Sequence, residues 1–100
     1  MVELNEAMKT YMTKIGMKNI VISVEEFTSW CAPPYKEILV SFTDEEKEEM
    51  LSKGYICDQS ELGDVYYPTE GVKIADKIAV NYVVYPWLER CEAEGIEIEP

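Results

Sequence analysis

The side chains best suited to chemistry in this sequence are its three cysteines, Cys31, Cys57 and Cys91. A cysteine thiolate can act as a nucleophile, bind a metal ion or take part in redox exchange. A small secreted scaffold usually carries more cysteines, in an even number. Three widely separated cysteines therefore predict free thiols in a reducing compartment.

Histidine is absent from the 100 residues. This excludes Ser–His and Cys–His nucleophilic pairs within the chain, imidazole zinc sites, and the usual general base near neutral pH. Carboxylate pairs such as Glu25–Glu26 are too common in an acidic chain to identify a general acid and base. No catalytic residue is predicted, and an enzyme is the least favoured interpretation.

The candidate site is the segment from residue 30 to residue 36, WCAPPYK. Cys31 is expected in a loop, where functional residues are common. Trp30, Tyr35 and Lys36 are its neighbours in sequence, and Lys36 would lower the pKa of the thiol if it also lay close in space. The alternative is that Cys31 is a small apolar residue packed beside Trp30.

The same segment is similar to the thioredoxin active site Trp-Cys-Gly-Pro-Cys-Lys, in which a second cysteine resolves the disulfide. Here Pro34 stands in place of the resolving cysteine, and the segment leads into a β-prone run instead of a helix. A thioredoxin-like oxidoreductase is therefore disfavoured. Cys57 is predicted to be structural, and the environment of Cys91 depends on whether residues 86–95 form a helix or a strand.

The net charge of −11 comes from nine basic and twenty acidic residues. Such a field repels polyanions, so neither nucleic acid nor an anionic membrane surface is predicted as a partner. We interpret the negative charge as keeping the protein soluble. The alternative interpretation is that it attracts a basic partner or a hard cation. No apolar run approaches the roughly 18 residues of a membrane-spanning helix, and the acidic N-terminus does not resemble a signal peptide. A cytoplasmic protein is expected.

The length predicts one domain, residues 1–100. Apolar residues at helical spacing predict a helix over Leu4–Ile15, ended by Gly16. Alternation predicts a strand over Asn19–Val24. Residues 25–36 are expected to be irregular, because proline cannot donate ladder hydrogen bonds.

A second strand is predicted over Glu37–Phe42, followed by a short surface helix. Thr43 and Glu46 suggest a capping box for that helix, and Gly54 suggests its end. The second half is expected to be β-structure, with strands at residues 55–57, 65–67, 72–75, 78–85 and 95–99. The predicted fold class is α+β: an N-terminal helix packed on a mostly antiparallel β-sheet, with a short inserted helix.

The seven tyrosines and two tryptophans mostly fall at positions compatible with strands, which indicates core and cross-strand packing. Four tyrosines could instead line a small-molecule pocket or a partner surface. They are Tyr66, Tyr67, Tyr82 and Tyr85.

The order of these elements resembles small HesB-like proteins, in particular the group named for a Cys-Cys or selenocysteine-Cys motif. The likeness rests on the helix, the strand Ile20–Val24, the loop Trp30–Tyr35, the strand Ile38–Phe42 and the later runs GVKI and EGIEI. It implies kinship of fold with A-type iron–sulfur carriers. Those carriers use one cysteine in mid-chain and a Cys-x-Cys pair near the C-terminus, whereas this sequence has Cys91 alone.

Two hypotheses follow. The first is a thiol-dependent metal, sulfur or iron–sulfur accessory protein, with Cys31 as the principal ligand and Cys91 as the next candidate. The cofactor would be an iron–sulfur cluster or a thiophilic metal. A cluster usually needs four thiolates, so a homodimer or an outside ligand would be required. The second is a non-catalytic interaction module that binds a protein partner through exposed tyrosines, Trp87 or a sheet edge.

Overall fold

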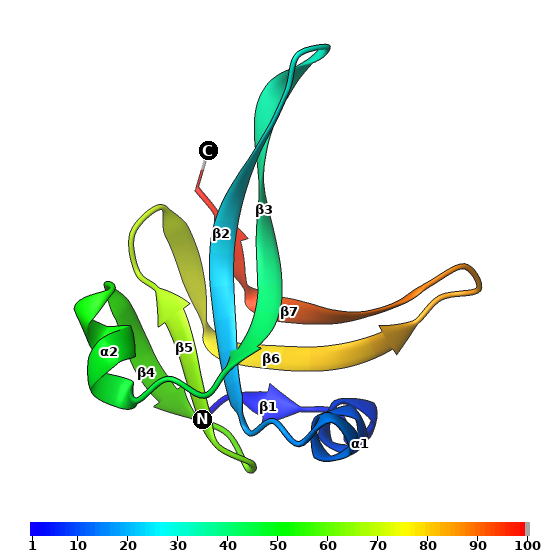
Figure 1. Ribbon diagram of the computed structural model, residues 1–100, viewed down its shortest axis with the longest axis vertical. Coiled ribbons are helices and arrows are strands. Elements are labelled where there is room, and N and C mark those ends of the chain that lie inside the picture. Colours follow the sequence, from blue (N-terminus) through cyan, green and yellow to red (C-terminus); the bar gives the residue numbers. More distant parts are fainter. Residues whose placement is uncertain (100) are drawn as a thin grey trace.

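The computed structural model describes residues 1–99, which form two β-sheets and two helices (Figure 1). One sheet has three strands in the order β1-β6-β7, and the other has four in the order β3-β2-β5-β4. The elements are β1 (Glu3–Leu4), α1 (Glu6–Ile15), β2 (Asn19–Ser29), β3 (Ala32–Thr43), α2 (Lys47–Ser52), β4 (Tyr55–Gln59), β5 (Asp64–Pro68), β6 (Val72–Val84) and β7 (Glu89–Ile98).

Helix α1 is capped at both ends. The Asn5 side chain accepts a hydrogen bond from the Met8 amide at 2.8 Å, which satisfies one of the free N–H groups of the first turn. Gly16 ends the helix in the left-handed region at φ 73°, and the Met17 amide donates back to the Met12 carbonyl. The helix starts two residues later than predicted, because β1 precedes it.

The predicted single, mostly antiparallel sheet is corrected to two mixed sheets. The short strand β1 pairs in parallel with β6, and β2 pairs in parallel with β5. The runs predicted at residues 72–75 and 78–85 belong to one strand, β6, whose register with β7 shifts between Ile74 and Ala79.

The prediction of an irregular segment at residues 25–36 is wrong. Strands β2 and β3 form one long hairpin, which turns only at Trp30 and Cys31. Pro33 and Pro34 are tolerated because β3 is the edge strand of its sheet, where a missing N–H is least costly.

Of residues 86–95, for which helix and strand were both considered, 89–95 lie in strand β7 and 86–88 in the turn before it. Strand β7 also includes most of the predicted edge strand near the C-terminus. The predicted capping box is wrong. Strand β3 runs through Thr43, and the N-cap of α2 is Glu46, whose side chain makes no capping bond. The Thr43 hydroxyl instead accepts from the Glu45 amide at 3.0 Å.

The main core lies between the two sheets and α1. Its largest fully buried members include Met8, Met12, Ile20 and Ile22. A smaller cluster of Val21, Met50 and Tyr66 lies on the other face of the four-stranded sheet, and α2 contacts β4 there. The β2–β3 and β6–β7 hairpins project beyond this core in different directions (Figure 1). The radius of gyration, 14.0 Å, is correspondingly above the roughly 13 Å typical of 100 residues.

Candidate functional site

Cys31 lies at the tip of the β2–β3 hairpin, in the two-residue turn that follows Ser29. Its side chain is exposed, and its Sγ is 3.1 Å from the Ser29 hydroxyl oxygen. The neighbouring Trp30 is 99% exposed, so it does not cover the thiol as an ordinary packing partner would. The tip therefore presents an accessible thiol to solvent.

The other residues of the predicted site are spread along the hairpin. Tyr35 stacks on Phe27 of the paired strand, with ring centroids 5.4 Å apart. Lys36 pairs in register with Glu26 and lies five positions after Cys31, which is roughly 15 Å of extended chain. The structure thus does not bring the Lys36 ammonium to the Cys31 thiol.

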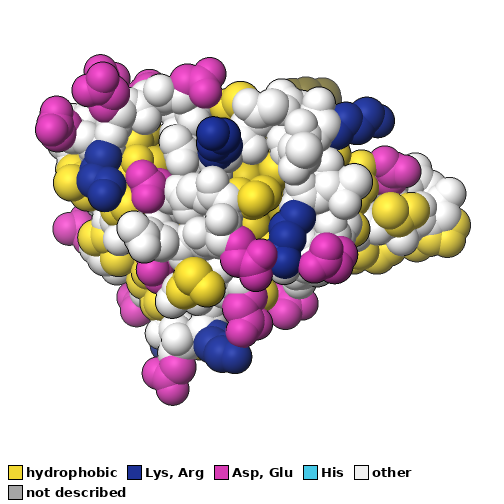
Figure 2. Space-filling view, turned by 90° about the horizontal axis from the view of Figure 1, so that it is seen from below, with side chains coloured by type: hydrophobic (Ala, Val, Ile, Leu, Met, Phe, Trp, Pro, Cys, Tyr) yellow, Lys and Arg dark blue, Asp and Glu magenta, His cyan; other side chains and the backbone are white. Residues whose placement is uncertain are grey.

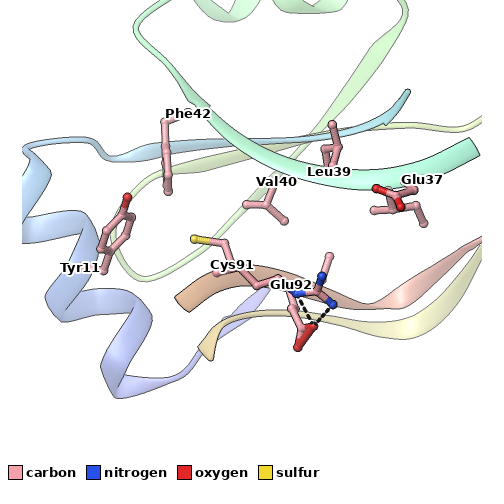
Figure 3. Close-up of a pocket in the computed structure, with 10 residues that line it drawn as sticks. Tyr11, Glu37, Leu39, Val40, Phe42, Cys91 and Glu92 are labelled. Carbon is pink, nitrogen blue, oxygen red and sulfur yellow. Dashed lines mark hydrogen bonds and ion pairs between the residues drawn. The ribbon is translucent and has the colours of Figure 1, made fainter. Parts of the chain in front are cut away.

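Cys91 lies in β7, in a groove between β7 and β3 (Figure 3). The groove has a volume of about 590 Å³. The half-buried thiol of Cys91 points toward Phe42 and Tyr11, and burial raises its pKa. The groove is lined by Tyr11, Glu37, Ile38, Leu39, Val40, Phe42, Arg90, Cys91, Glu92 and Ala93.

The helical side of this groove is formed by Tyr11, which belongs to an aromatic pair. Tyr11 of α1 stacks on Tyr82 of β6, with ring centroids 4.5 Å apart. The Tyr82 hydroxyl donates to the Glu89 carboxylate, and this bond raises the pKa of Tyr82 to about 12. Sequence reasoning singled out Tyr82 but not Tyr11, because the contact depends on how α1 lies across β6.

The opposite face of the β6–β7 hairpin carries a polar cluster. The Tyr85 hydroxyl donates to Glu92 at 2.9 Å, and Arg90 forms an ion pair with the same carboxylate at 2.6 Å. The guanidinium of Arg90 and the Tyr85 hydroxyl lower the pKa of Glu92. Beyond the cluster, Tyr85 stacks on Trp87, which is 76% exposed.

The hairpin tip beyond Trp87 is a second exposed apolar surface. Val84 and Leu88 are also exposed there, and Figure 2 shows hydrophobic side chains along the projecting end of this hairpin. Tyr66 and Tyr67 are buried in the sheet instead, so they line no accessible pocket.

Cys57 lies in β4 opposite Tyr66, on the side of the sheet near α2. Its thiol donates to the carbonyl of Asp58 at 3.5 Å. Burial, and then the negative charge of Asp64, raise the pKa of Cys57. These contacts agree with the structural role predicted for it.

The three thiols do not meet within one chain. Cys91 faces the part of β3 at residues 38–42, which begins seven positions after Cys31, roughly 20 Å or more of strand. Cys57 lies in β4, which β2 and β5 separate from β3 in the four-stranded sheet. Among residues 1–99, no group of three or more Cys, His, Asp or Glu side chains is placed to hold a metal ion. A single chain therefore does not fit an iron–sulfur cluster.

No protein-family model and no curated protein matches this sequence. The fold does match solved structures. Escherichia coli SufA, which is involved in the biosynthesis of iron–sulfur clusters, has a TM-score of 0.57 and 13% identity, over 94% of this chain and 79% of its own. IscA, solved with a [2Fe-2S] cluster, has a TM-score of 0.59 and 16% identity, over 95% of this chain and 85% of its own.

These neighbours confirm the predicted kinship of fold: the chain has the HesB-like fold of A-type iron–sulfur carriers. At such low identities the likeness concerns the fold alone. In the part of the chain that the structure describes, no helix is long and apolar enough to cross a membrane.

Proposed function

We propose that this protein is an accessory protein of iron–sulfur or thiophilic-metal chemistry that binds its metal together with a second chain. The observation that carries the proposal is the exposed thiol of Cys31 at the end of a projecting hairpin. A metal ion or cluster held by a second protein can contact a thiol at such a position without a conformational change in this chain.

The fold supports this assignment, because SufA and IscA share it. The separation of the three cysteines explains why a second chain is required. Iron–sulfur clusters usually need four thiolates, and one chain offers Cys31 alone at the tip. The missing thiols would come from a partner protein or from a second copy, whose Cys91 is then the next candidate.

The test is the metal and acid-labile sulfide content per chain after anaerobic purification, with and without reconstitution. Cys31→Ser is compared with the native chain, and Cys57→Ser serves as the matched control because its thiol lies under α2. We expect bound metal that is lost in Cys31→Ser and kept in Cys57→Ser. Equal metal in both variants would rule out Cys31 as a ligand.

The second candidate function is a protein-interaction module without metal. It is favoured by the exposed aromatic side chains at the two hairpin tips, above all Trp30 and Trp87. Large exposed aromatic residues are typical of protein interfaces. Absence of metal in the native chain, even after reconstitution, would favour this function over the first.

A further inference from the structure

Strand β7 has an unpaired edge, and the hydrogen bonds of its hairpin show which main-chain groups form that edge. The Tyr85 amide donates to the Leu88 carbonyl at 2.7 Å, which makes these two residues a hydrogen-bonded pair. Along an antiparallel ladder such pairs alternate with pairs that exchange no hydrogen bond. In the observed register, the pair Tyr82–Cys91 is of the second kind.

The β6 side of the ladder confirms this alternation. The amide and carbonyl of Tyr82 bond to the side chain of Asn5, at 3.2 and 3.3 Å, instead of to β7. By the same alternation, the N–H and C=O groups of Cys91 and Ala93 point away from β6. No main-chain hydrogen bond joins β7 to β3 among residues 1–99. These groups therefore form the free edge of β7, beside the groove between β3 and β7.

The two faces of this edge differ in chemistry. Cys91 and Ala93 pack against the core on the apolar side, where Val40 and Phe42 of β3 also line the groove. Glu92 and Glu94 alternate with them, and Figure 3 shows the Glu92 side chain pointing away from the Cys91 sulfur. The groove volume, about 590 Å³, lies in the range of ligand sites, roughly 300–1,000 Å³.

The charges indicate what can occupy this edge. A second copy of the chain would bring another net charge of −11. Like charges opposite each other in a sheet are destabilising, whereas opposite charges are favourable. Acidic residues on an edge strand thus oppose self-pairing, but they attract a basic strand.

We propose that the free edge of β7 binds an extended segment of a basic partner protein, in which apolar and Lys or Arg residues alternate. Its main chain pairs with Cys91 and Ala93, its apolar side chains enter the groove, and a basic side chain lies beside Glu94, since Arg90 already pairs with Glu92. This mode of strand addition combines main-chain hydrogen bonds with side-chain selection. It goes beyond the proposed function and does not use Cys31.

The test uses synthetic peptides of alternating lysine and valine, titrated into the full ¹⁵N-labelled chain. We expect binding with shifts of the amide signals of residues 89–94, and slower hydrogen exchange at Cys91 and Ala93. A peptide of alternating glutamate and valine, and a lysine–valine peptide N-methylated at its central amides, should not bind. Equal binding of either peptide, or shifts confined to the hairpin tips, would overturn the proposal.

Protein variants supply the matched controls. Glu94→Lys should weaken binding of the lysine–valine peptide roughly five-fold or more, because a favourable cross-strand pair becomes a repulsive one. Glu48→Lys makes the same charge change on α2, away from β7, and should alter binding by less than about two-fold. Equal loss in both variants would indicate attraction by net charge alone. A dimer of the free chain with Cys91 and Ala93 already protected would also overturn the proposal.

Discussion

At the scale of single residues, the three cysteines have the same functional group in three different environments. Cys31 is exposed at a hairpin tip, whereas burial raises the pKa of both Cys57 and Cys91. Reaction rates of thiols depend on the thiolate fraction and on access. Both factors disfavour Cys57 and Cys91, so Cys31 is the thiol best placed to meet an external metal, oxidant or partner.

We therefore expect Cys31 to be alkylated by iodoacetamide at least about ten times faster than Cys91 or Cys57 near neutral pH. The measurement is the rate of modification at each cysteine, followed by peptide mass spectrometry. In denaturant the three rates should converge, which controls for intrinsic differences between the peptides. Comparable rates for Cys31 and Cys91 in the folded chain would contradict the arrangement described above.

The environments of Cys31 and Cys91 could be predicted from the sequence to different extents. Cys31 does lie in an exposed turn, but this turn consists only of Trp30 and Cys31, and the prolines on which the loop prediction rested lie in β3. The groove around Cys91 was not predicted. It is built by Tyr11, Phe42 and β7 residues far apart in sequence, and no spacing along the chain encodes such a contact.

At the scale of elements, the long strand β6 bends where its register with β7 shifts, and Gly95 of β7 lies at that place. Gly95 has φ 85°, a conformation that side chains other than glycine's rarely adopt. A Cβ atom there would lie 2.0 Å from the carbonyl oxygen of Lys77. Glycine is thus required both for the backbone conformation and for the close approach of the two strands.

Gly95→Ala should lower the free energy of unfolding by about 3 kcal/mol or more, because left-handed strain adds to a main-chain clash. Gly71→Ala is the matched control: its φ is 75°, but nothing lies within 4 Å of the added Cβ. It should cost only about 1 kcal/mol. Urea denaturation monitored by circular dichroism measures both, and equal losses would show that the close approach to Lys77 is not real.

The elements also show which parts of the fold the sequence could predict. Helix α1 follows from its apolar spacing and from Gly16. The hairpin β2–β3 could not be predicted, because two prolines indicated that the segment was not a strand. Pro33 and Pro34 are compatible with β3 only because β3 lies at the edge of its sheet. Local patterns do not contain strand order, so neither the edge nor the division into two sheets could be inferred.

At the scale of the whole molecule, the unbalanced negative charge opposes folding. Acidic side chains spread over the face shown in Figure 2, and few basic ones lie among them. Ion pairs such as Lys77–Glu3 and Lys53–Glu45 are exposed. Exposed pairs contribute only about 0–1 kcal/mol each. Repulsion among the excess carboxylates acts on the compact state more than on the unfolded chain.

Added salt should therefore stabilise this protein, since screening weakens the repulsion of a net charge of −11 more than it weakens a few exposed ion pairs. We expect the free energy of unfolding to rise by about 1 kcal/mol between roughly 0.02 and 0.5 M NaCl, seen as a higher urea midpoint at constant slope. Each Glu→Lys change raises the net charge by two, so the double variant Glu48→Lys, Glu70→Lys has −7 and should gain less from salt. A midpoint that falls with salt would mean that the ion pairs outweigh the repulsion, and the acidic surface would then cost the fold nothing.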